Sequence, residues 1–173
     1  MFSKTDIEQY FVAEKKESLL FLCIGIASVI AALVCWFLLK QAVYKGAAVP
    51  MLVVGLLLGV VGYTVYQRSD GDRMRNVYAY DMNPSQLKNE EIPRMKTVMK
   101  NFLIYRYTEI FLMVAGAALF IYFYRNGSNE FWKGFGLALA VLALIALCAD
   151  YFAEQRGKIY TDGLISFTSK HGS

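Results

Sequence analysis

The sequence predicts an all-α integral membrane protein whose four transmembrane helices form two repeated helical hairpins, and three observations lead to this class. The 173 residues are 57% hydrophobic and only 18% charged, below the roughly 25% charged residues of soluble domains. Four apolar segments are each long enough to cross a bilayer core of about 30 Å at about 1.5 Å per residue. The second and fourth segments align with each other without a gap at a shift of 88 residues.

The N-terminal segment, residues 1–18, carries Ile7, Tyr10 and Phe11 at helical spacing among polar residues. This pattern is typical of an amphipathic helix. We expect the helix to lie on the membrane surface and to lead into the first span. A solvated helix is the alternative.

The first hairpin is predicted over residues 19–66, with its spans at 19–39 and 47–66. Trp36 stands at the far end of the first span, where aromatic residues mark a membrane interface. Pro50 is expected in the first turn of the second span, where its missing N–H breaks no hydrogen bond.

Residues 67–101 are predicted as a loop with short amphipathic helices. The Ser-Asp-Gly-Asp run at residues 69–72 is a turn signal, and Pro84 and Pro93 are placed near helix starts. From Met95 the apolar residues keep helical spacing and continue into the third span.

The second hairpin is predicted over residues 102–152, with spans at 102–124 and 131–152 that are joined by a tight polar turn. The tail, residues 153–173, is polar. Gly157 and Gly163 argue against a long helix there, because glycine disfavours helix interiors.

Lysine and arginine counts predict the orientation. Thirteen of these residues lie in the N-terminal segment, the central loop and the tail, whereas four lie in or beside the two opposite turns. Because basic residues accumulate on the cytoplasmic side, both termini are expected in the cytoplasm, with the spans in the cell inner (plasma) membrane.

The repeat is supported by polar matches at both borders of the aligned spans. At the shift of 88, Lys45-Gly46 meets Lys133-Gly134, and Gln67-Arg68 meets Gln155-Arg156. The first and third spans align less well, at a shift near 92. Two copies with the same orientation form a parallel repeat about an axis along the membrane normal, which predicts a pseudo-twofold bundle. Chance resemblance between apolar segments is the alternative.

Small residues on the second and fourth spans are candidate helix-packing positions, because they let two membrane helices bring their backbones together. The contact lies either within the bundle or between subunits. Gly59→Leu is expected to be the sharpest test of it. The positions are Gly55, Gly59, Gly62, Gly136 and Ala140.

Arg106 and Glu109 are three residues apart on the third span, so they are predicted to pair on one helix face. The pair is placed either at the headgroup level or inside the bundle, since charges at membrane depth are expensive and often functional. A substrate or proton site is a third reading of the same two residues.

Basic residues at both ends of the central loop are predicted to contact anionic lipid headgroups. Tyr78 and Tyr80 in the same loop favour docking of a protein partner, since aromatic residues are enriched in interfaces. A homo-oligomer is a second kind of partner, and nucleic acid is not expected. The basic residues are Arg68, Arg73, Arg75, Lys96 and Lys100.

No catalytic motif stands out, and the three cysteines and one histidine are too scattered for a metal or redox centre. We therefore expect no enzyme, no metal and no cofactor. The sequence favours a small protein that acts by protein–protein contact, as a membrane-complex subunit, a regulator or a toxin-immunity protein. The alternative is an oligomeric ion channel or small-solute carrier with Arg106 and Glu109 near its path.

Overall fold

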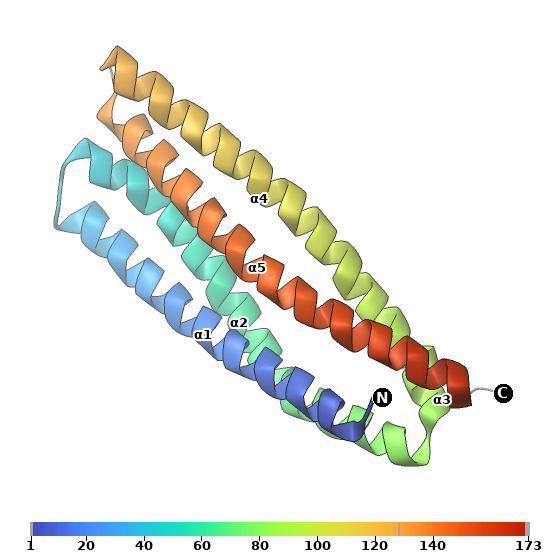
Figure 1. Ribbon diagram of the computed structural model, residues 1–173. Coiled ribbons are helices and arrows are strands. Elements are labelled where there is room, and N and C mark those ends of the chain that lie inside the picture. Colours follow the sequence, from blue (N-terminus) through green and yellow to red (C-terminus); the bar gives the residue numbers. More distant parts are fainter. Residues whose placement is uncertain (1, 128, 172–173) are drawn as a thin grey trace.

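The computed structural model describes residues 2–127 and 129–171, and every regular element within them is helical (Figure 1). Two short elements, α3 (Pro84–Gln86) and the π-helical turn η1 (Leu87–Glu91), connect the second long helix to the third. All four long helices are long and apolar enough to cross a membrane, which confirms the predicted number of candidate spans. The long helices are α1 (Lys4–Phe37), α2 (Ala42–Met82), α4 (Ile92–Asn126) and α5 (Glu130–His171).

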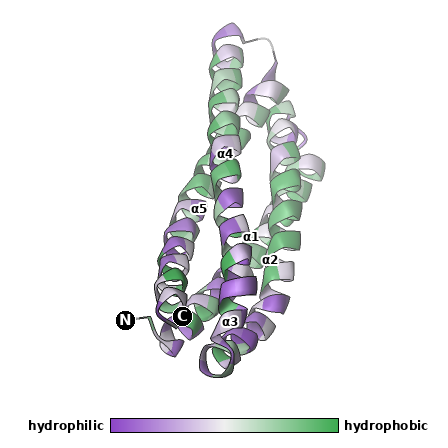
Figure 2. Cartoon of the chain, turned by 90° about the vertical axis from the view of Figure 1, so that its right-hand side faces the viewer, coloured by the Kyte–Doolittle hydropathy of each residue, from purple (hydrophilic) through white to green (hydrophobic). Residues whose placement is uncertain are grey.

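The long helices form a row in the order α1, α2, α5, α4. Each helix packs along its neighbour in this row, and the backbones of α1 and α4 come within 8 Å of each other nowhere in the described chain. In Figure 2 the hairpin of α4 and α5 stands on one side and the hairpin of α1 and α2 on the other. The outer helices therefore do not close a ring along the apolar stretches. Their side chains meet at the polar end, where the hydroxyl of Tyr10 on α1 lies 3.6 Å from the sulfur of Met95 on α4.

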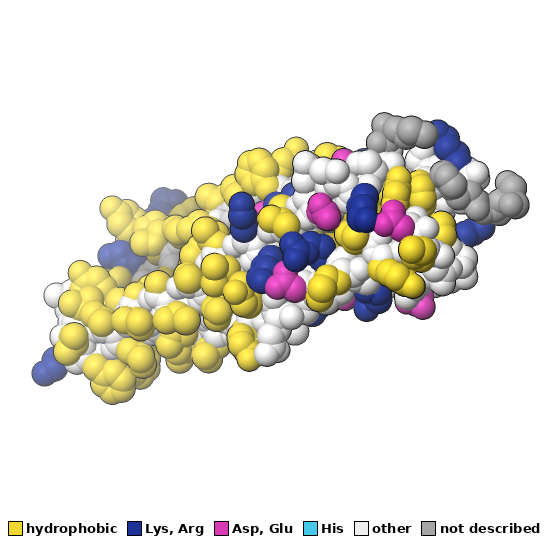
Figure 3. Space-filling model, turned by 90° about the horizontal axis from the view of Figure 1, so that it is seen from below, with side chains coloured by type: hydrophobic (Ala, Val, Ile, Leu, Met, Phe, Trp, Pro, Cys, Tyr) yellow, Lys and Arg dark blue, Asp and Glu magenta, His cyan; other side chains and the backbone are white. Residues whose placement is uncertain are grey.

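The compact core lies at the polar end of the molecule, where the start of α1, η1 and the end of α5 meet (Figure 1). The apolar stretches behave differently, since only 6% to 22% of the residues in the most apolar part of each long helix are buried. Figure 3 shows the same division, with apolar side chains over one half and most charged side chains over the other. The largest fully buried apolar side chains at the polar end are those of Ile7, Phe11, Leu87, Met95 and Leu164.

In each hairpin the backbones of the two helices come into close contact. A Cβ on Gly25 of α1 would stand 2.6 Å from the backbone nitrogen of Gly59 on α2. A Cβ on Gly116 of α4 would stand 2.7 Å from the nitrogen of Ala140 on α5. Both distances are below normal contact, so only glycine fits at positions 25 and 116.

The buried face of α2 repeats every seven residues and carries only small or polar side chains. A seven-residue period corresponds to 3.5 residues per turn and is typical of helices that wind around each other with a left-handed supercoil. The buried residues in this register are Ala48, Gly55, Gly62, Ser69 and Asn76.

The predicted turn at residues 69–72 is wrong, because α2 runs through it without a break. The polar side chains of this run have partners that a helix can accommodate. Ser69 donates through Oγ to the carbonyl of Val65 at 2.7 Å, Asp70 pairs with Lys15 of α1, and Asp72 accepts from Arg75 at 2.9 Å. The break between α2 and α4 is consequently confined to residues 83–91.

The position predicted for Pro50 is also wrong. Helix α2 begins at Ala42, so Pro50 lies in its interior rather than in its first turn. There the missing N–H leaves the carbonyl of Gly46 without its usual helical donor. The helix nevertheless continues, held at this end by contact of Gly46 with Phe131 of α5.

The N-terminal segment is part of the first span helix, since α1 is continuous from Lys4 to Phe37. Its apolar side chains do not face a membrane surface as expected. Ile7, Tyr10 and Phe11 are buried against the other helices, because the ends of α4 and α5 extend beside them.

The tail prediction fails for a related reason, since α5 is helical as far as His171. Its two glycines lie at close contacts. A Cβ on Gly157 would stand 3.3 Å from the sulfur of Met99, and Gly163 faces the ring of Phe2. Tertiary packing outweighs the low helix propensity of glycine here.

Candidate functional site: a polar belt across three helices

Six charged residues lie where the apolar stretches of α1, α4 and α5 give way to the polar end, and we call this group the polar belt. Arg156 of α5 donates through both Nη atoms to the carboxylate of Glu17 on α1. Arg106 of α4 donates to Glu154 of α5. The polar belt consists of Glu17, Arg106, Glu109, Asp150, Glu154 and Arg156.

The predicted pairing of Arg106 with Glu109 is wrong, because both residues face side chains of α5 instead of each other. Arg106 reaches across to Glu154, while the carboxyl group of Glu109 lies beside that of Asp150 on α5. The reason is tertiary, because α5 brings two carboxyl groups to the face of α4 that carries Arg106 and Glu109. Spacing along α4 alone does not contain this information.

The Glu109–Asp150 pair has a chemical consequence. Two carboxylates side by side repel each other, and a proton on one of them removes that repulsion. One oxygen of Glu109, Oε2, is buried and has no hydrogen-bond partner among the described residues. Neither arginine of the polar belt pairs with these two carboxyl groups, since Arg106 binds Glu154 and Arg156 binds Glu17.

A second charged group, not predicted from the sequence, lies inside the polar-end core. Glu91 of η1 is 2% exposed and accepts from Nε and Nη2 of Arg94 at 2.8 and 2.7 Å. It also accepts from the hydroxyl of Tyr160 at 3.2 Å, and the ring of Tyr160 stacks on Tyr10 at 4.1 Å. In the sequence, this ion pair was indicated only by the three-residue spacing of Glu91 and Arg94 at a predicted helix start.

This pairing sets the protonation state of both partners of Glu91. Burial works to lower the pKa of Arg94, but the carboxylate of Glu91 outweighs it and the pKa is raised. Burial, with the nearby negative charge of Glu91, raises the pKa of the Tyr160 hydroxyl. Arg94 stays charged and Tyr160 stays neutral, so the network holds one compensated ion pair.

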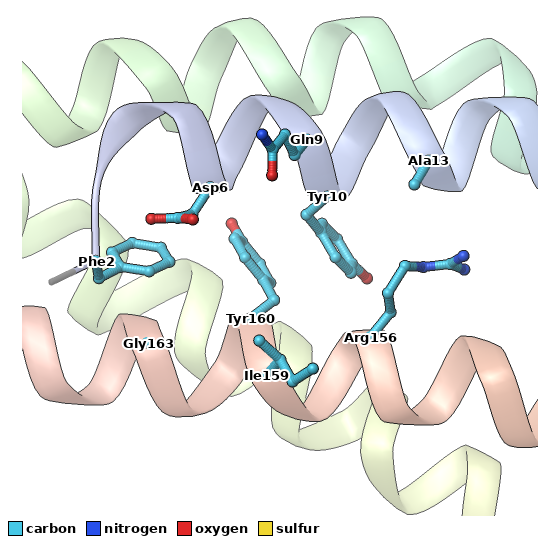
Figure 4. Close-up of a pocket in the computed structure, with 9 residues that line it drawn as sticks. All are labelled: Phe2, Asp6, Gln9, Tyr10, Ala13, Arg156, Ile159, Tyr160 and Gly163. Carbon is cyan, nitrogen blue, oxygen red and sulfur yellow. The ribbon is translucent and has the colours of Figure 1, made fainter.

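A groove of about 510 Å³ lies between α1 and α5 beside this network (Figure 4). Phe2 lines one end and Arg156 the other, with Tyr10 and Tyr160 between them. Because Arg156 is bound to Glu17, that end of the groove is part of the polar belt.

The candidate packing residues lie at different depths in the helix contacts. Gly55 and Gly62 face α1, where a Cβ would come within 3 Å of α1 atoms. Gly136 and Ala140 lie at the crossing with Gly116. The backbone of Gly59 touches Gly25, but a Cβ on Gly59 would have no atom within 4 Å. Gly59→Leu is therefore not the sharpest test of the contact.

The basic residues expected at lipid headgroups fall into two groups. Arg68, Arg73 and Arg75 have acidic partners on α1 or α2 at 2.9 to 4.0 Å. Lys96 and Lys100 are exposed on α4. Contact of these residues with lipid stays a prediction.

The surroundings of Glu14 predict how the stability of the fold depends on pH. This residue is largely buried between Arg68 and Ser69, and burial raises the pKa of its carboxyl group. A carboxyl group whose pKa is higher in the folded than in the unfolded state costs stability once it ionises. The free energy of unfolding therefore falls as the pH rises from the pKa of the unfolded state through that of the folded state. Glu14→Gln should therefore raise the unfolding midpoint at pH 7 relative to the native chain, and leave it nearly unchanged at pH 4. Denaturant unfolding in detergent at the two pH values measures this, and equal effects at both would contradict it.

Comparison with protein families, with curated proteins and with solved structures gives no match to this chain.

Proposed function

We propose that the chain is a small, non-catalytic, multi-pass inner-membrane protein that acts by protein–protein contact, with both termini in the cytoplasm. It would serve as a subunit, a regulator or an immunity protein. The polar end would then project into the cytoplasm as a packed, rigid unit, and the apolar stretches would offer their surfaces to other membrane helices.

The observation that carries this proposal is the open row of helices. A protein that encloses a path through the membrane needs helices arranged around it, whereas here the backbones of α1 and α4 come within 8 Å of each other nowhere in the described chain and the apolar stretches are at most 22% buried. The cluster of buried apolar side chains lies at the polar end. Such a division leaves the span surfaces free for contacts with partners.

The charges of the polar belt support the same reading. Arg106 and Arg156 are each compensated by a carboxylate from another helix. Paired in this way, they link α1 and α4 to α5 at the border of the apolar stretches. They act in the proposal as fixed connections that hold the hairpins in position.

The parallel repeat is part of the proposal, and reciprocal contacts between α2 and α5 support it. A side chain on Gly46 would overlap the carbonyl of Phe131, and one on Gly134 would overlap the carbonyl of Val43. The shift of 88 converts residue 43 into 131 and residue 46 into 134. A contact in which residue i meets j and j meets i is the signature of a twofold relation.

An oligomeric channel or carrier is the second candidate, and the Glu109–Asp150 pair favours it. Two neighbouring carboxyl groups at the border of an apolar stretch are a feature of proton-coupled transport sites. Because one protomer is an open row, the path would have to be completed by further subunits.

Flux from liposomes separates the two functions. Purified protein in vesicles with a pH-sensitive dye is expected to give the same proton leak as empty vesicles, and the variant Glu109→Gln/Asp150→Asn is expected to give the same trace. A leak that the native protein raises at least tenfold and the variant abolishes would overturn the contact function. Reporters fused to each terminus test the orientation, which both termini outside would contradict.

A further inference from the structure

We propose that the outer face of α2 is a dimerisation surface for a second, parallel copy of this chain. The inference rests on the proposed membrane arrangement, because copies that share one membrane and one orientation place their α2 helices parallel. It adds the surface and the partner to the contact function.

The surface is a line of residues along α2 with alternating spacings of four and three, which we call the outer seam. This 3.5-residue period is the one at which two helices stay in contact over many turns. The outer seam lies opposite the buried seven-residue repeat, so both faces follow the same supercoil. All its members are exposed, and they are Val53, Leu57, Val60, Thr64, Gln67, Gly71, Met74 and Tyr78.

The part of the outer seam beyond the span has no lipid to cover it. Met74 lies eight residues past Tyr66, the last residue of the predicted span, which is about 12 Å along the helix. Yet Met74 and Tyr78 are 63% and 65% exposed, and Met82, one turn further on, is 70% exposed. Three large side chains at four-residue spacing on a polar, projecting helix form an apolar patch that fits another protein surface.

The flanking charges select a second copy as that partner. Asp70 and Arg75 border the outer seam on opposite sides. Within the chain Asp70 pairs with Lys15, and Arg75 pairs with Asp72. Both side chains nevertheless remain about half exposed, so each can also meet a charge of a second copy. In a parallel helix pair, the residue on one flank meets the residue five positions later on the opposite flank of the other helix, and such pairs decide partner and orientation. Asp70 of each copy therefore meets Arg75 of the other, which gives two symmetric pairs of opposite charge.

The centre of the outer seam fits the border of the membrane. Thr64 and Gln67 follow the apolar members and precede Gly71. Hydroxyl and amide side chains of this kind hydrogen-bond across paired membrane helices. In a twofold dimer each of them meets its own equivalent, as an isologous interface requires.

Disulfide crosslinking tests the placement. In a background with Cys23, Cys35 and Cys148 replaced by alanine, Met74→Cys and Tyr78→Cys should each crosslink efficiently in native membranes. Ile159→Cys is the matched control, because Ile159 is 73% exposed but lies on α5, and its crosslinking should be at least tenfold lower. Equal crosslinking at all three positions would overturn the proposal, as would crosslinking of Met74→Cys only to Met82→Cys, which marks an antiparallel pair.

Charge reversal tests the partner. Asp70→Arg and Arg75→Asp should each lower dimer formation about fivefold, in line with the modest strength of exposed ion pairs, and the double variant should restore it. Lys96→Glu, which reverses an exposed charge on α4 away from the outer seam, should leave dimer formation unchanged. A double variant as weak as the single ones would overturn the proposal, provided that circular dichroism shows each variant folded. Terminal reporters report the orientation separately, so a missing dimer with both termini inside counts against the dimer and not against the contact function.

Discussion

Gly62→Leu is expected to disrupt the first hairpin, whereas Gly59→Leu, three residues away on the same helix, is expected to be tolerated. A Cβ on Gly62 would stand 2.6 Å from the backbone nitrogen of Leu22 and 2.6 Å from the carbonyl oxygen of Ser18. These are backbone atoms that cannot move aside without separating α1 from α2. We expect a loss of about 3 kcal/mol or more in the free energy of unfolding, at the upper end of overpacking effects.

Gly59→Leu provides the matched control. The position of its Cβ is open, and leucine favours a helix more than glycine by roughly 1 kcal/mol. Unfolding of both variants in mixed micelles, followed by circular dichroism, measures the difference. If both variants lost stability equally, the assigned direction of the glycine face would be wrong.

Glu91→Ala is expected to have an effect of similar size at the other end of the molecule. The substitution leaves the guanidinium of Arg94 in the core without its carboxylate, and leaves the hydroxyl of Tyr160 without its acceptor. Removing one partner of a buried ion pair costs about 3 to 5 kcal/mol. The same unfolding experiment should show this loss.

The neighbouring Glu90→Ala is the control for this site. Glu90 is exposed, and its carboxylate accepts a hydrogen bond from the side chain of Gln86 at 3.0 Å, so its loss should change stability by less than about 0.5 kcal/mol. Replacing both members of the pair, as Glu91→Leu/Arg94→Met, should recover part of the stability, because no buried charge remains. A single Glu91→Ala variant as stable as Glu90→Ala would contradict the assigned role of the pair.

Hydropathy predicted the four long helices, and glycine spacing pointed to Gly55 and Gly62, which lie in the α1–α2 contact. The errors share one physical cause. Polar residues that signal turns in isolation, such as the run at 69–72, are helical here because partners on α1 satisfy them. Glycines that disfavour a helix, such as Gly157, are helical because another helix packs there.

The candidate site shows the same limit. The charged residues Arg106 and Glu109 were visible from their spacing, but their partners lie on α5, 48 and 41 residues away along the chain. The burial of Glu91 could hardly be predicted, because a carboxylate shortly before Pro93 is typical of the start of an exposed helix. Its burial follows from the fold of η1 against α5.

The sequence by itself determined the number of long apolar helices and some of the small residues at which they touch, such as Gly55 and Gly62 but not Gly25 or Gly116, because hydropathy and side-chain volume are properties of each position. The tertiary structure alone decided that these helices continue far beyond their apolar stretches, that they form an open row, and which carboxylate pairs with which arginine. The physical reason is that a helix end or a buried charge is stable only when another segment supplies its partner. In this chain the partners come from helices that are distant in sequence.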